Sequence, residues 1–476
     1  MDMTLPGRKR PSRSRKHAER RDTGRGPLIA GALFLAVLLL TGGSSRFDMP
    51  SLIVLYPAAA LACAYALTRL TGADFARVRV PLLLLLALGA WMALQLVPLP
   101  PSLWHGLPQR DAIVAIDALT GNAELWRPLT LVPNRTLSTL AGLLVPLAAL
   151  LLYTVQPRDR RRMAVQLLGL IGLASALWGA LQMLGAPDGP MYLYRITNEG
   201  LAVGFFANRN HQGVVLACSI VALAWVAIYG SEGPRGGTWR ILALSGIALI
   251  APIIVLAGSR AGLFLCAAAL VLSAWMWWQR PLPGGGKGKA RSVNWWVVAG
   301  LALVPLALIA IVLTSSRSLA LTRLFEEDET EGLRLQLIPI VNDLIATFFP
   351  WGSGFGTFQQ VYGMVEPFDM LEPRYLNLAH NDVWQWPLEG GLPAVLILLV
   401  FLGWLGLRAV RAIGEARERS GSVFASQRVV ALVILAFMLA AAFFDYALRT
   451  PIGMVYFAIG VCVLTQSGGK RVGRTD

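Results

Sequence analysis

Apolar residues gather along this chain in long uninterrupted runs, separated by shorter stretches that hold most of the charges. An α-helix needs about 20 consecutive apolar residues to cross the hydrocarbon core of a bilayer, and runs of this length recur throughout the chain. The pattern predicts an all-α polytopic membrane protein with about twelve transmembrane helices. The expected spans are 27–43, 50–67, 80–98, 136–155, 163–184, 211–229, 241–258, 261–279, 294–314, 391–408, 428–445 and 451–467.

The runs divide the chain into one membrane domain with two short tails. Residues 1–26 form a basic tail, 27–467 a single transmembrane domain, and 468–476 a second tail. The longest polar segment, 315–390, lies between spans nine and ten. The first apolar run is followed by further spans and lacks a small-residue cleavage site, so a cleavable signal peptide is not expected.

The distribution of charge fixes the expected orientation. The chain has a net charge of +15, a mean hydropathy of +0.58 and only 14% charged residues. With the N-terminal tail placed inside, the inner segments hold 30 Lys and Arg against 9 Asp and Glu, and the outer segments hold 12 against 18. This asymmetry is the positive-inside rule, which predicts that both termini are cytoplasmic and excludes a nucleic-acid partner as the reason for the charge. Core packing is expected for the four cysteines, which all lie in apolar runs: Cys63, Cys218, Cys266 and Cys462.

The stretch YLNLAHNDVWQWPLEGG, residues 375–391, concentrates polar and titratable groups directly before an apolar run. Within it, His380 is followed by Asn381 and Asp382. A histidine can accept a hydroxyl proton near neutral pH, and a neighbouring amide or carboxylate can orient its ring. The alternative is a histidine that caps the tenth span or bonds at the interface.

Two arginines are expected on the same outer side. Arg260 lies in AGSRAG, where spans seven and eight are joined with almost no loop, and Arg334 lies early in the segment 315–390. The planar guanidinium fork matches phosphate oxygens and stays charged at any working pH. Charges near a bilayer usually face an interior or a cavity, although Arg260 could also reach lipid phosphates.

The entrance of span six reads GFFANRNHQG and brings together Asn208, Arg209, Asn210 and His211. One interpretation is polar capping of a membrane helix, a position that asparagine favours. The other is a re-entrant polar loop that faces a cavity, because non-helical backbone at membrane depth requires one.

The outer segments carry further local signals. Residues 101–135 are long enough for a short interfacial helix, with Trp104 and Trp126 as interface anchors. Asp445 and Arg449, in the last outer turn, are expected to pair locally. Alternating glycines in WGSGFGTF, residues 351–358, indicate a tight turn, since no Walker lysine follows. A helical apolar stripe is formed by Leu333, Leu337, Val341, Leu344, Ile345 and Phe348.

Four of these motifs together resemble the bacterial O-antigen ligase/polymerase family. They are GFFANRNHQG, AGSRAG, the segment from Arg334 through PWGSGFGTF, and AHNDVWQWPLEGG, and the similarity covers roughly residues 135–450. The resemblance implies a multi-spanning fold like that of the C-type glycosyltransferases, with a large periplasmic segment. It also implies an essential HN histidine, matched by His380, and two essential arginines, matched by Arg260 and Arg334. The family's Asn-Pro-Asn motif reads Asn208-Arg209-Asn210 here, a departure that leaves the acceptor open.

The resemblance and the outer-side groups lead to one preferred function. A base with two phosphate-binding arginines suits metal-independent, inverting transfer of a glycan from an undecaprenyl-diphosphate donor to a hydroxyl. Within the family the acceptor is lipid A–core, another lipid-linked glycan or a protein hydroxyl. The expected location is the bacterial inner membrane, with no cofactor and no metal. A transporter or flippase of an anionic lipid-linked glycan is the alternative, and a non-catalytic assembly factor is a third.

Overall fold

The computed structural model describes the residues 25–46, 49–230, 236–278, 329–371, 376–418 and 423–466. Within these ranges seven helices are long and apolar enough to cross a membrane. The chain is therefore a polytopic α-helical membrane protein, as its apolar pattern predicts. The seven candidate spans are α4 (Gly72–Gln95), the pair α7 (Pro133–Gly142) and α8 (Leu144–Val155), α10 (Ala164–Leu184), α11 (Arg209–Tyr229), α12 (Gly236–Ala257), α13 (Arg260–Trp278) and α18 (Asp382–Glu418).

Four shorter apolar helices account for other predicted spans. They are α2 (Gly26–Thr41), α3 (Leu52–Leu67), α19 (Val423–Ala441) and α20 (Pro451–Thr465). They correspond to the first, second, eleventh and twelfth predicted spans. The ninth, 294–314, lies outside the described residues, so the total of twelve remains a prediction.

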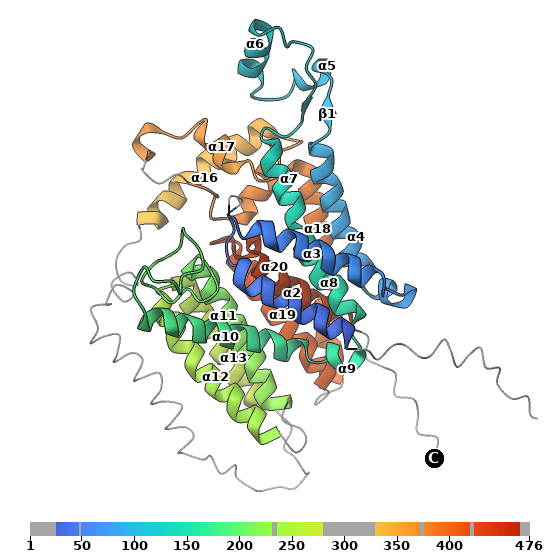
Figure 1. The fold of residues 1–476 in the computed structure, drawn as a ribbon, viewed down its shortest axis with the longest axis vertical. Helices are drawn as coiled ribbons and strands as arrows, with labels where there is room; N and C mark the ends of the chain where they lie inside the picture. Colours follow the sequence, from blue (N-terminus) through green and yellow to red (C-terminus); the bar gives the residue numbers. More distant parts are fainter. Residues whose placement is uncertain are drawn as a thin grey trace, which may run out of the picture.

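Helix α11 is at the centre of one group of helices. It packs against α10, α12 and α13, and every residue from His211 to Ile228 is buried (Figure 1). Small residues allow the close approach of α13: a Cβ added to Gly213 would lie 2.9 Å from the Cα of Gly262. Glycine at such contacts is how membrane helices gain packing without a hydrophobic driving force. The four cysteines are free and buried, as expected.

A second group of helices lies beside the first. Helix α3 packs on α8, α8 on α20, and α4 on α18, while α19 contacts both α11 and α20 and so joins the groups (Figure 1). The turn after α2 also touches both groups, because Gly42 accepts a hydrogen bond from Ile452 N and Gly43 accepts one from Ala207 N. The loops around residues 207 and 451 are therefore held close together.

Helices α16 (Glu329–Phe348) and α17 (Phe358–Gly363) and the 3-10 turn η1 (Phe368–Met370) lie at one end of the bundle (Figure 1). The apolar stripe predicted for α16 is confirmed where its side chains are described, because Leu337, Val341 and Phe348 are buried. They pack in a cluster that also holds Leu388 of α18. Helix α16 thus folds back onto the start of α18.

An arm projects beyond this end of the molecule (Figure 1). It contains a two-residue strand pair, β1 (Pro98–Leu99) with β2 (Arg127–Pro128), and the helices α5 (Pro101–Trp104) and α6 (Asp111–Leu119). The interface-anchor role predicted for Trp104 is wrong. Its ring is fully buried and its Nε1 donates to Leu125 O, which makes it the core of the arm.

Helix α18 begins earlier than the predicted span at 391. It runs from Asp382, with one break at Gly391, where φ is 61° and ψ is −162°. The backbone of Pro350 approaches this break, and its O accepts a 2.8 Å hydrogen bond from Leu392 N. A Cβ on Gly391 would lie 2.2 Å from the same oxygen, so glycine is required here. The break separates a polar first segment from the apolar remainder.

Candidate active site

His380 lies immediately before α18 with an unusual backbone. Its φ is +51°, a left-handed conformation that few side chains other than Gly, Asn, Asp and His adopt. Asn381 fixes the next position, since its Oδ1 accepts from Val383 N at 2.9 Å and its Nδ2 donates to Phe443 O at 2.8 Å. The HN turn is therefore tied both to its own helix and to the turn that follows α19.

The side chain that faces the imidazole ring of His380 is that of Asp445, and not that of the neighbouring Asn381 or Asp382. His380 Nδ1 lies 3.7 Å from Asp445 Oδ1, and His211 Nε2 lies 3.5 Å from the same oxygen. These separations exceed a formed hydrogen bond, as is common for catalytic contacts before substrate binds. Burial opposes ionisation of Asp445, but His211 and His380 outweigh it and hold the pKa of this carboxyl well below its usual range.

The predicted pair between Asp445 and Arg449 is wrong. Arg449, at the end of the 3-10 turn η2 (Ala447–Arg449), instead bonds Asp382 Oδ1 at 2.5 Å and Glu389 Oε2 at 3.1 Å. Both carboxylates lie on one face of the first segment of α18, where they are buried. The arginine consequently clamps this segment to the turn before α20. This long-range pairing is not visible in the sequence, because the two ends meet only through the packing of α18 on α19 and α20.

Glu389 links this clamp to the glycine turn. Its Oε1 accepts from Gln385 Nε2 at 2.8 Å and from Phe358 N at 3.3 Å, and its backbone O accepts from Gly354 N at 3.0 Å. Gln385 in turn accepts a 2.9 Å hydrogen bond from Ala379 N, next to the histidine. The hydrogen bonds thus continue from the glycine turn to the HN turn.

The glycine turn has the tight geometry that its spacing predicts. Gly352, Gly354 and Gly356 all have positive φ, at 79°, 109° and 83°. A Cβ on Gly354 would lie 2.0 Å from Thr130 Oγ1, so the turn presses against the segment before α7. No other residue type fits this conformation and this distance.

At the start of α11, the capping interpretation is confirmed. Asn208 is the N-cap, and its side chain accepts from Asn210 N at 2.8 Å. The preceding residues, 201–206, are buried without being helical. Gln182 satisfies their backbone by bonding both N and O of Gly204, and Ser175 accepts from Phe205 N. This packed loop presents His211 to Asp445.

The structure describes the side chain of one predicted arginine, Arg260, but only the backbone of the other, Arg334. Arg260 is the first residue of α13 and is partly exposed, at the same helix end as His211 because α13 packs on α11. Arg334 lies in α16, but its side chain is outside the described residues. Helix α16 packs on α18, and Trp384 Nε1 of α18 donates to Asn342 Oδ1 at 2.8 Å. The helix that carries Arg334 is therefore adjacent to the HN turn.

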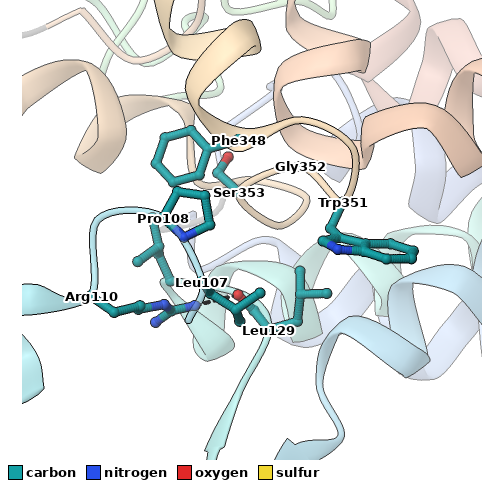
Figure 2. A pocket seen from close by; sticks show the side chains of 9 residues that line it. Leu107, Pro108, Arg110, Leu129, Phe348, Trp351, Gly352 and Ser353 are labelled. Carbon is teal, nitrogen blue, oxygen red and sulfur yellow. Dashed lines mark hydrogen bonds between the residues drawn. The ribbon is translucent and has the colours of Figure 1, made fainter. Parts of the chain in front are cut away.

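A small enclosed space lies between the arm and the glycine turn (Figure 2). Arg110 donates to Pro128 O and Leu129 O at its edge. Burial, with Arg127 nearby, lowers the pKa of Arg110 to about 10. The space measures about 10 Å³, enough for one water molecule but not for a sugar or a phosphate. Arg110 thus ties the start of α6 to the end of β2, and the site is elsewhere. Across the described ranges, no group of three or more His, Cys, Asp and Glu is arranged to hold a metal ion.

The helices and the buried polar site define the class: a polytopic membrane protein with titratable groups gathered at one end of its helices. The family model described as O-Antigen ligase matches residues 245–399, and this match supports an O-antigen ligase-like family for the chain. The match contains Arg260, Arg334 and His380, whereas His211 and Asp445 lie outside it. No curated protein matches the chain.

Proposed function

We propose that this protein is a membrane glycosyltransferase of the O-antigen ligase or polymerase type. The observation that carries the proposal is His380, whose Nδ1 is buried against Asp445 while the side chain keeps 22% of its surface exposed. A carboxylate at Nδ1 favours the tautomer with the proton on that nitrogen, which leaves Nε2 as a free base. An accessible base at the end of a membrane bundle suits activation of a hydroxyl group. General ligase-type transfer is what the family match supports.

The proposed reaction is inverting and metal-independent. The acceptor oxygen attacks the anomeric carbon of a glycan carried on undecaprenyl diphosphate, and its proton passes to His380 Nε2. The bond from this carbon to the phosphate oxygen breaks, and the diphosphate leaves with the electron pair. Arg260 and Arg334 neutralise the charge that develops on the diphosphate. The acceptor is a hydroxyl of lipid A–core, of a second lipid-linked glycan or of a protein.

The proposal places this reaction on the periplasmic side of a bacterial inner membrane. The apolar runs favour twelve spans, and the distribution of Lys and Arg favours both termini in the cytoplasm, which would put the HN turn outside. His211, Asp445 and Arg260 lie at helix ends that this topology also places outside. The lipid-linked donor would reach the site from within the bilayer.

The test is reconstitution. Purified protein in lipid nanodiscs would be incubated with undecaprenyl-diphosphate oligosaccharide and each of the three acceptor classes, with EDTA present. We expect glycan on one acceptor, with the opposite anomeric configuration, together with released undecaprenyl diphosphate. Intact donor with every acceptor, while liposomes show movement of the lipid-linked glycan across the bilayer, would support the transporter instead.

A further inference from the structure

Neither helix capping nor helix packing explains why a histidine is buried at position 211. It lies in the first turn of α11, is only 1% exposed, and neither of its ring nitrogens has a formed hydrogen bond within the described residues. Its Nε2 lies 3.5 Å from the Asp445 oxygen that also faces His380. A buried polar ring without a formed hydrogen bond is costly, so its retention at this position needs a reason.

The surroundings of His211 repeat those of His380. Tyr446 lies against both imidazoles edge-on, with ring centroids 4.9 Å from His211 and 4.8 Å from His380. The same residue donates its backbone N–H to Asp445 Oδ1 at 2.9 Å. One carboxylate oxygen and one aromatic ring thus contact both histidines. The four side chains come from α11, the HN turn and the turn before α20.

We propose that His211 is a positioning residue for His380, an inference that rests on the proposed function. By sharing Asp445, His211 prevents the carboxylate from rotating away from His380 Nδ1. By packing on Tyr446, it holds the ring that supports the second imidazole. His380 Nε2 is then kept in the direction from which an acceptor hydroxyl must arrive. A carboxylate that held only one imidazole would lack this second restraint.

Other charged side chains lie near His211, His380 and Asp445. Asp382 and Glu389 are bound by Arg449, so they do not compete for either imidazole. Arg209 and Arg260 begin the helices α11 and α13 at the same end. Positioning therefore depends on the Asp445 contact and not on a second carboxylate from α18.

The test uses two substitutions of His211 in the whole chain. His211→Gln keeps an N–H donor near the position of Nε2, whereas His211→Phe keeps the packing on Tyr446 but cannot donate. We expect the transfer rate of His211→Phe to fall on the order of 10²-fold, the loss typical of a reacting group displaced by about 1 Å. The dissociation constant for the donor should stay unchanged, and His211→Gln should recover most of the rate. A wild-type rate in His211→Phe would overturn the inference, as would rate losses that follow thermal stability equally in both variants.

A second readout is independent of activity. In protein with ¹⁵N-labelled histidine, the ring shifts of His380 report its tautomer. Wild type and His211→Gln should show the proton on Nδ1, and His211→Phe a mixture of tautomers. The same tautomer in all three proteins would contradict the positioning role, even if no acceptor proves active. Absence of transfer in wild type with the expected tautomer shift would contradict the proposed function alone.

Discussion

At the scale of the residue, the backbone of His380 is the most informative feature. Strained conformations persist where the surrounding structure imposes them, and they gather at functional sites. Here Asn381, Asp445 and the start of α18 impose a φ of +51°. The strain turns the imidazole toward Asp445 and exposes its other nitrogen.

Two substitutions at His380 test whether its left-handed backbone conformation is strained. His380→Gly removes the Cβ that disfavours this conformation, whereas His380→Ala keeps it. We expect the glycine variant to be more stable than the alanine variant by about 1 kcal/mol. Thermal unfolding in detergent measures the difference. Equal stability would show that the left-handed backbone relaxes when the imidazole is removed.

The arginines give a second prediction at this scale. Arg260→Lys and Arg334→Lys keep the charge but lose the two-pronged fork that fits a diphosphate. We expect each change to reduce transfer by about tenfold or more, with the fold unchanged. Donor titration and circular dichroism on each variant provide the measurement and its control. Wild-type turnover in both lysine variants would assign these arginines to structure.

Residue types alone indicated part of the candidate site. His380, Arg260 and Asn208 stand out in the sequence because polar groups are rare in apolar surroundings. Asp445 could not be assigned to His380 in this way. The turn DYALRTP suggested a local pair, and only the packing of α19 beside α11 and α18 brings the carboxylate to both histidines.

At the scale of the element, the glycine turn and the break in α18 fit into each other. The spacing of the glycines predicted a turn, but its neighbours depend on contacts distant in the sequence: Gly354 lies against Thr130, and Gly352 lies against Glu389 and Gly391. The β1–β2 pair was not predicted, since two residues with a proline carry no strand periodicity. Such elements exist only through the fold around them.

The turn can be tested with two alanine substitutions. Gly354→Ala would place a Cβ 2.0 Å from Thr130 Oγ1 at a φ of 109°, and we expect a loss of stability of about 1–3 kcal/mol. Gly363→Ala, at the end of α17, meets no atom within 4 Å and serves as the control. Its stability should stay within about 0.5 kcal/mol of wild type. Similar unfolding midpoints for the two variants would contradict the close packing of the turn.

At the scale of the whole molecule, the sequence predicted the membrane class, and the structure confirms it with seven candidate spans. Helix ends were less predictable, because capping and breaks such as Gly391 move them by several residues. The orientation rests on the distribution of charge.

Orientation is therefore a separate prediction. Reporter fusions at Lys287 and Glu327, two positions outside the described residues, should report the cytoplasm and the periplasm respectively, because lysine and arginine gather in the inner segments. Enzymatic reporters active on only one side of the membrane provide the measurement. The same side for both positions would overturn the predicted topology.

In the proposed reaction His380 removes the acceptor proton, and the variant His380→Asn tests this step. Asparagine tolerates the left-handed backbone and remains polar but cannot act as a base. Single-turnover transfer from undecaprenyl-diphosphate oligosaccharide would be measured beside donor binding on the same sample. We expect normal binding and a transfer rate lower by about 10²–10⁴-fold. A folded His380→Asn protein that transfers glycan at the wild-type rate would contradict it.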